Sequence, residues 1–140
     1  MYTLEEFDRE KTKVMKYIVF KKRTENEVRQ KFQSSIEENI LEDIIEYIKD
    51  AGYINDYEYI EKQVNEYKLL KTLSIKEIKY KLLSKGLSKD LVDDYIQANY
   101  DELQEYENQC LERMISKKSK TMDEEKLKLY LFKKGYRGQI

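Results

Sequence analysis

Lysine and aromatic side chains recur three and four residues apart in the segment of residues 75–84. On a helix, Lys76, Lys79 and Tyr80 would lie on one side, and Ile78 and Leu82 would lie on the opposite side. A ring beside lysine ammonium groups suits a partner protein surface, or stacked bases with neighbouring phosphates. We therefore take these three residues as a candidate contact patch.

The same pattern returns about 50 residues later. Leu129 takes the place of Tyr80, and Lys126 and Lys133 flank it. Further cations are candidates for the same partner, and they are Lys85, Arg113, Lys117, Lys118, Lys120 and Arg137. Such clusters can meet phosphates or an acidic protein surface, but charge runs also form ordinary solvated helix faces. Both interpretations stay open at the level of sequence.

The charge of the chain is balanced overall and uneven along its length. Charged residues make up 39% of 140 residues, with a net charge of −1. Residues 1–70 hold 12 basic and 16 acidic groups, net −4, whereas residues 71–140 hold 15 and 12, net +3. A net charge near zero argues against a general DNA-coating protein. If the chain contacts a polyanion, we expect the contact to lie within residues 71–140.

Several kinds of chemistry are excluded by missing residue types. There is no histidine and only one cysteine, so Ser-His-Asp catalysis, Cys-His catalysis and Cys-only zinc sites are ruled out. The carboxylate runs, such as Asp93-Asp94, lack the glycine and alternate spacing of a calcium loop. We expect no enzyme activity, no cofactor and no metal. No signal peptide or membrane span is evident, and we expect a cytoplasmic protein.

The elements that position these residues are expected to be helices throughout. The chain has no proline and four glycines, and its apolar residues repeat at helical spacing. About eight apolar stripes are present; their members include Phe7/Val14/Ile18, Val28/Phe32, Leu41/Ile44/Ile45/Ile48, Ile60/Val64/Tyr67, Ile75/Ile78/Leu82, Leu91/Tyr95/Ile96, Leu103/Tyr106/Cys110/Met114 and Leu127/Tyr130/Leu131. We predict an all-α fold of about eight helices, with Cys110 as a small core residue.

Capping signals mark the expected helix boundaries. The S/T-x-x-E spacing of a capping box occurs at Thr24/Glu27, Ser74/Glu77 and Thr121/Glu124. Gly52, Gly86 and Gly135 stand where helices should end, because glycine enters the left-handed region at little cost. The chain therefore has three predicted capped helix starts and three predicted glycine stops.

The distances between these signals reveal an internal repeat. Aligning Gly86 with Gly135 superposes SIKEIKYKLLSKGL on DEEKLKLYLFKKGY, and TENEVRQKF supplies a weaker first copy. We predict one all-helical repeat domain over residues 1–140, with three-helix repeats at about 8–54, 55–100 and 101–140. The third repeat is expected to be incomplete, because few residues follow Gly135.

The segment GYIND at residues 52–56, the segment IKEIKYKLLSKGLSKDLV and the terminal LFKKGY resemble the RecX family of bacterial RecA regulators. The resemblance covers the chain from about residue 10 onward. It implies tandem three-helix repeats in an elongated, curved, non-enzymatic molecule. It also implies binding to the RecA filament on single-stranded DNA, with damping of strand exchange and ATP hydrolysis. Its hallmark positions here are Gly52, Tyr53, Asp56, Gly86 and Gly135.

GYIND also has a purely structural explanation. Gly52 would end a helix, Tyr53 and Ile54 would pack in the corner, and Asn55 or Asp56 would cap the next helix. A RecA modulator could also bind DNA weakly and directly. Two other functions stay open beside RecA modulation. One is a RecA-independent nucleic-acid-binding protein, and the other is a helical protein-interaction scaffold. We expect a monomer that regulates, mainly by inhibition, the RecA recombinase and its ATPase activity.

Overall fold

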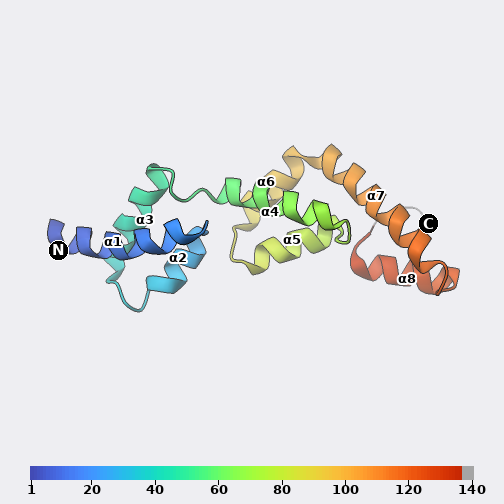
Figure 1. Ribbon diagram of the computed structural model, residues 1–140, viewed down its shortest axis with the longest axis horizontal. Coiled ribbons are helices and arrows are strands. Elements are labelled where there is room, and N and C mark those ends of the chain that lie inside the picture. Colours follow the sequence, from blue (N-terminus) through green and yellow to red (C-terminus); the bar gives the residue numbers. More distant parts are fainter. Residues whose placement is uncertain (137–140) are drawn as a thin grey trace. The chain divides into compact units, whose positions relative to one another are not determined.

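The computed structural model describes residues 1–136, and these residues form eight α-helices and no strand (Figure 1). The helices are α1 (Leu4–Phe20), α2 (Glu25–Phe32), α3 (Glu38–Asp50), α4 (Asp56–Leu70), α5 (Ile75–Ser84), α6 (Lys89–Ala98), α7 (Tyr100–Lys118) and α8 (Glu124–Lys134). The predicted all-α fold of about eight helices is confirmed. None of these helices is long and apolar enough to cross a membrane.

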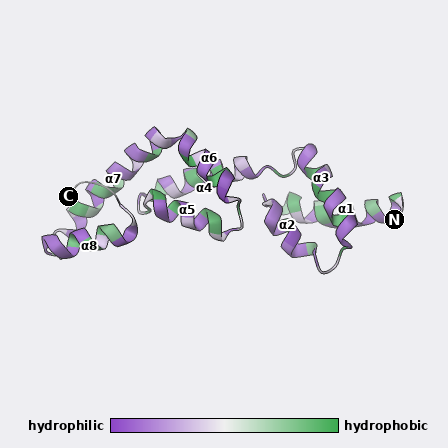
Figure 2. Ribbon diagram, turned by 180° about the vertical axis from the view of Figure 1, so that it is seen from behind, coloured by the Kyte–Doolittle hydropathy of each residue, from purple (hydrophilic) through white to green (hydrophobic). Residues whose placement is uncertain are grey.

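The chain divides into two compact units. Unit 1 contains Met1–Tyr59 with Lys85–Leu87, and unit 2 contains Ile60–Ser84 and the chain from Ser88 onward. Apolar and polar residues take different sides of the helices, as the helical spacing of the sequence predicts (Figure 2). The division into three repeats stays a prediction.

Unit 1 has a continuous core formed by α1, α2 and α3. The stripe of α3 supplies five buried residues, which pack with Val14 and Ile18 of α1 and with Val28 and Phe32 of α2; the five are Ile40, Leu41, Ile44, Ile45 and Ile48. The rings of Tyr17 and Phe32 meet edge to face, with centroids 5.5 Å apart. Burial of these stripes is the main stabilising contribution in this unit.

The connection between α3 and α4 contains the GYIND motif. Gly52 has a φ of +80° and ends α3, and buried Ile54 packs in the core of unit 1. The prediction for Tyr53 was wrong, because its ring is exposed rather than packed in the corner. The Oδ1 of Asn55 accepts the backbone N–H of Glu58 at 3.1 Å, and so caps α4.

Asp56 has a different role, because it bonds to the start of a helix that is distant in the sequence. Its Oδ1 accepts the backbone N–H of Glu25 at 3.1 Å. Glu25 is the first residue of α2, so this N–H has no acceptor within its own helix. Burial raises the pKa of the Asp56 carboxyl, against the lowering effect of that backbone hydrogen bond. The motif therefore completes the start of an earlier helix as well as the turn that contains it.

Two of the three predicted capping boxes are confirmed. Thr24 with Glu27 forms the reciprocal pair of bonds at the start of α2. Ser74 with Glu77 does the same before α5, at 3.1 and 3.0 Å.

The third prediction was wrong. Asp123 caps α8 by accepting the N–H of Lys126, and Thr121 donates instead to the carbonyl of Lys118. Asp123 is an equally strong cap and stands directly before the first helical residue.

In unit 2, the connection between α4 and α5 is held by side chains from distant helices. The Tyr106 hydroxyl donates to the carbonyl of Leu73 at 2.8 Å, and the Tyr136 hydroxyl donates to that of Thr72 at 3.3 Å. Ser74 Oγ donates to the carbonyl of Lys134 at 2.5 Å, at the end of α8. Three consecutive residues are thus attached to α7 and to the end of α8. Cys110 is fully buried in this unit, as predicted.

The end of α8 lies directly against the start of α5. Gly135 has a φ of +97°, and a Cβ atom placed on it would come within 2.8 Å of the Lys76 Cβ and 3.1 Å of Ser74 Oγ. A side chain here would be both strained and crowded. Glycine at this position therefore permits the close approach that the Ser74 hydrogen bond needs.

Candidate partner-binding surface

The side of α5 that faces away from the core presents the predicted contact patch. The capping box at Ser74 fixes where the helix starts, and burial of Ile78 and Leu82 fixes its rotation. Tyr80 and Lys76 are consequently exposed. The predicted inward side is confirmed for Ile78 and Leu82, and the predicted outward side is confirmed for Lys76 and Tyr80.

Lys79 has a partner that the sequence pattern did not reveal. Its Nζ lies 2.7 Å from Asp93 Oδ1 on α6, and Lys89 Nζ lies 2.7 Å from the other carboxylate oxygen. Hydrogen bonds from Lys79, which has the larger effect, and from Lys89 lower the pKa of Asp93. Lys79 is half-buried and its charge is balanced within the protein. Lys76 is therefore the cation of the patch that is available to a partner.

A groove of about 500 Å³ runs beside the patch within unit 2. It is lined by residues of α5, α6 and α7 and by Gly135, and its apolar lining includes Ile75, Leu83 and Ile96. Tyr80 and Tyr100 add two exposed aromatic rings. Its polar lining has both signs of charge, from Lys76, Lys79, Asp93 and Glu107, and also contains the amide of Gln104. A concave, mainly apolar surface with a few polar groups is typical of a recognition site.

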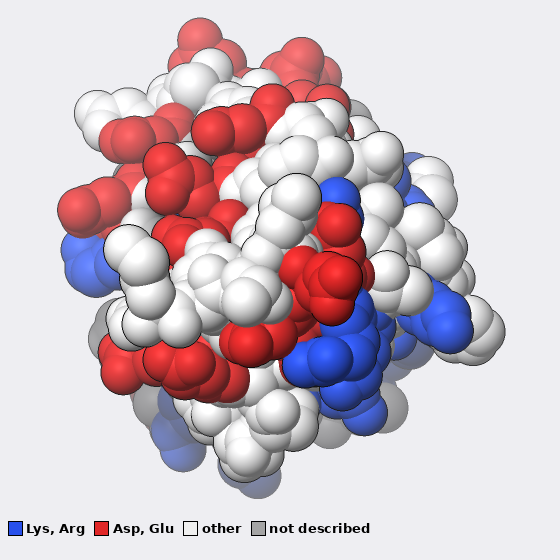
Figure 3. Space-filling view, turned by 90° about the vertical axis from the view of Figure 1, so that its left-hand side faces the viewer, with Lys and Arg blue, Asp and Glu red and all other residues white. Residues whose placement is uncertain are grey.

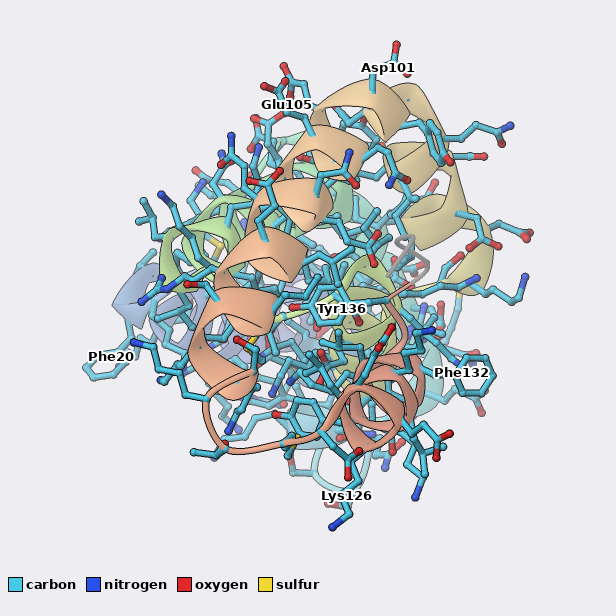
Figure 4. All side chains as sticks on the ribbon, turned by 90° about the vertical axis from the view of Figure 1, so that its right-hand side faces the viewer. Phe20, Asp101, Glu105, Lys126, Phe132 and Tyr136 are labelled. Atoms are coloured by element: carbon cyan, nitrogen blue, oxygen red, sulfur yellow. The ribbon has the colours of Figure 1, made fainter. Side chains whose placement is uncertain are left out.

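The repeated patch on α8 is likewise exposed. Leu129, Lys126 and Lys133 all reach solvent, and Phe132 beside them is an exposed apolar residue as well. Figure 4 shows Lys126 and Phe132 projecting away from α8, whereas Tyr136 points inward. The helix therefore presents two large apolar side chains among lysines, a composition typical of interfaces rather than of solvated surface.

The remaining predicted cations are less informative. Arg113, Lys117 and Lys120 are exposed near the end of α7, where positive charge also favours the helix dipole. Lys118 is half-buried, with Nζ 5.4 Å from the centroid of the Tyr130 ring. Lys85 is exposed and belongs to unit 1, not to the α5 patch in unit 2. Arg137 lies outside the described residues.

Unit 1 carries an excess of negative charge, in contrast to the lysine-rich patches on α5 and α8. Aspartate and glutamate predominate on the face that Figure 3 presents, in agreement with the excess of acidic residues before residue 70. Among residues 1–136, no group of three or more His, Cys, Asp or Glu side chains is placed to hold a metal ion. This acidic face would repel phosphate, so any phosphate contact belongs elsewhere.

Sequence reasoning missed several residues of the site. Tyr100, Gln104 and Asp93 reach the groove from α6 and α7, and nothing in local spacing assigns them to the side of α5. Phe132 had a usable signal, because it follows Leu129 by three residues and so must share its face. Extending the i, i+3 pattern by one step would have found it.

Comparison with known proteins gives a consistent result. No protein-family model matches the chain. The chain is 31% identical over 133 residues to "Regulatory protein RecX" of Staphylococcus carnosus, covering 90% of this chain and 49% of that protein. It is 30% identical over 142 residues to the protein of the same name in Clostridium perfringens, covering 94% and 65%. The chain thus spans about half to two thirds of the length of these curated relatives.

Solved structures show the same fold. A crystal structure of RecX from Lactobacillus salivarius superposes with a TM-score of 0.78 at 24% identity, over 96% of this chain and 90% of that one. A second crystal structure, of a regulatory protein RecX, gives a TM-score of 0.75 at 18% identity, over 95% and 69%. Sequence identity over nearly the whole chain and a shared helical fold agree, and the chain belongs to the RecX family.

Proposed function

We propose that this chain binds the filament that RecA forms on single-stranded DNA, and that it mainly inhibits the recombinase and ATPase activities of RecA. The relatives are named regulatory proteins, which supports a regulatory rather than a catalytic role. The observation that carries the proposal is the exposed Tyr80 beside Lys76, next to the groove of unit 2. We further propose that the protein acts in the cytoplasm without a cofactor.

The α5 patch has the composition of an interface anchor. A tyrosine contributes a large apolar surface with few rotatable bonds, so fixing it costs little conformational entropy. Lys76 adds a positive charge, which steers the patch toward phosphate or acidic protein groups. Lys79 does not add to this charge, because Asp93 already pairs with it. Its role in the proposal is to hold α5 against α6 beside the groove.

The second patch on α8 allows a repeated contact. Leu129, Phe132 and their neighbouring lysines offer an anchor of similar composition on another repeat. A filament presents identical protomers at regular intervals, so two patches on one chain can engage together and gain affinity. Occupying the filament in this way would bridge protomers and block the second DNA.

The test is the DNA-dependent ATPase activity of RecA, titrated with the wild-type chain and with single variants. Lys76→Glu and Tyr80→Ala should each raise the half-inhibitory concentration by about tenfold. Lys62→Glu on α4 is the matched control, because it makes the same charge change on another exposed lysine. The control should inhibit like the wild type. Lys79→Glu is unsuitable, since it would place two carboxylates together with Asp93.

The same titration separates the alternatives. Tight, steeply salt-dependent binding to single-stranded DNA without RecA would favour an independent nucleic-acid-binding protein. If the folded wild-type chain neither inhibits RecA nor binds DNA, the remaining alternative is a helical protein-interaction scaffold. Inhibition that is equal for Lys76→Glu, Tyr80→Ala and the control would show that the α5 patch is not the contact. The α7 cations, from Arg113 to Lys120, would then be the next to test.

A further inference from the structure

Two pairs of large apolar residues are exposed at equivalent ends of two helices. Val19 and Phe20 end α1 with 69% and 83% of their surface exposed, and Leu69 and Leu70 end α4 with 81% and 60%. The two pairs are 50 residues apart, which is also the distance between Thr24 and Ser74. We call them the apolar pairs. Single exposed leucines are ordinary, but adjacent pairs recurring at one position of a repeat are not.

Each pair is followed by a lysine. Lys21 follows the first pair and Lys71 the second, and both side chains are exposed. Within the described residues, neither lysine forms an ion pair. Lys71 also has a φ of +52°, and it is the only described residue other than glycine with a positive φ. This conformation is uncommon for residues other than glycine, and it occurs directly after the second pair.

The pairs are held in place by the structure that follows them. After Leu70 and Lys71, the backbone of Thr72 and Leu73 accepts the hydroxyls of Tyr136 and Tyr106. After Phe20, Arg23 lies 4.0 Å from the centroid of the Tyr17 ring. Figure 4 shows Phe20 projecting away from α1. A backbone that is already anchored loses little freedom on binding, as an interface anchor requires.

The composition of the pairs selects the kind of partner. Three of the four side chains are aliphatic and offer no aromatic face on which bases could stack. They suit apolar pockets on a protein. The unpaired lysines beside them call for carboxylates at the rim of such pockets. Two pairs of similar composition suit a partner that presents the same pocket more than once.

We propose that the apolar pairs insert into apolar pockets, rimmed by carboxylates, on the protein component of the filament. This inference rests on the proposed function and adds to it a second type of contact. The α5 and α8 patches provide charge and aromatic surface, whereas the apolar pairs contact the RecA protomers themselves.

The experiment is co-sedimentation of the folded chain with RecA filaments assembled on oligo(dT), titrated at several salt concentrations. Leu69→Gln with Leu70→Gln, and Val19→Gln with Phe20→Gln, are the two test variants. Glutamine has a helix propensity similar to that of leucine and higher than those of valine and phenylalanine, so the helices should form as before. Leu4→Gln is the matched control, because Leu4 is 75% exposed on α1 and belongs to neither pair.

Each double variant should raise the Kd by at least about tenfold, while Leu4→Gln should change it by less than about twofold. The slope of log Kd against log salt should stay at the wild-type value, because no charge is removed. Lys71→Gly should behave differently. It should raise the unfolding midpoint by relieving the positive φ, and it should weaken binding with a smaller salt slope.

The outcomes separate the two proposals. If the wild-type chain does not sediment with filaments, the proposed function fails and the inference fails with it. If the wild type binds and both double variants bind equally well, only the inference is overturned. It is also overturned if the double variants bind RecA-free oligo(dT) more weakly than the wild type does. It is overturned likewise if light scattering detects self-association of the wild type and the double variants abolish it.

Discussion

Replacing Ser74 by alanine should destabilise unit 2 by about 2 kcal/mol. Its hydroxyl makes two bonds at a site that is fully buried: it accepts the N–H of Glu77 at 3.1 Å and donates to the carbonyl of Lys134 at 2.5 Å. Loss of a cap costs about 1 kcal/mol. Leaving the Lys134 carbonyl without its donor adds about 1 kcal/mol, because the buried site gives water little access to replace it.

Ser88→Ala supplies the comparison that isolates the second contribution. Ser88 also caps a helix of unit 2, with its hydroxyl accepting the N–H of Leu91 at 3.2 Å, but the side chain is exposed and its hydroxyl forms no other hydrogen bond with the described residues. Its loss should cost about 1 kcal/mol. The assay is urea unfolding followed by far-UV circular dichroism for the wild type and both variants. Equal shifts of the unfolding midpoint would refute the reasoning, since the bond between α5 and the end of α8 would then contribute nothing.

Two further predictions concern the core and the tyrosines of unit 2. Ile78→Ala should lower the free energy of unfolding by about 2–5 kcal/mol, because the side chain is buried. A urea midpoint near that of the wild type would show that this side of α5 does not face the core. Stability should also fall as the pH rises above about 10, the ordinary tyrosine pKa. Burial raises the pKa of both Tyr106 and Tyr136, so the folded state keeps protons that the unfolded chain releases. Urea midpoints measured at increasing pH should decline less steeply in Tyr136→Phe, and an unchanged decline would contradict this assignment.

Local patterns predicted the helices and their buried sides well. The spacing of Ile78 and Leu82 was sufficient to orient α5, because helix geometry translates spacing directly into direction. The motif at Thr121 misled for the opposite reason. Its spacing matched a capping box, but Asp123 two residues later is an equally good cap, and spacing alone does not choose between them.

Contacts between distant residues could not be predicted in this way. The pairing of Lys79 with Asp93 depends on how α6 packs against α5, and it removes a cation from the predicted patch. The bond from Glu25 to Asp56 joins residues 31 positions apart. The resemblance to a family marked Asp56 as important without giving the reason. The reason is physical, namely an N–H at the start of α2 that needs an acceptor.

The bond between Ser74 and Lys134 has a consequence for the order of events on the ribosome. The two residues are 60 positions apart, and Tyr136, which holds Thr72, is 64 positions from it. During synthesis, the segment that precedes α5 emerges long before the groups that fasten it. Unit 2 can therefore form its helices early, but it reaches its final packing only when almost the whole of the described chain has left the exit tunnel.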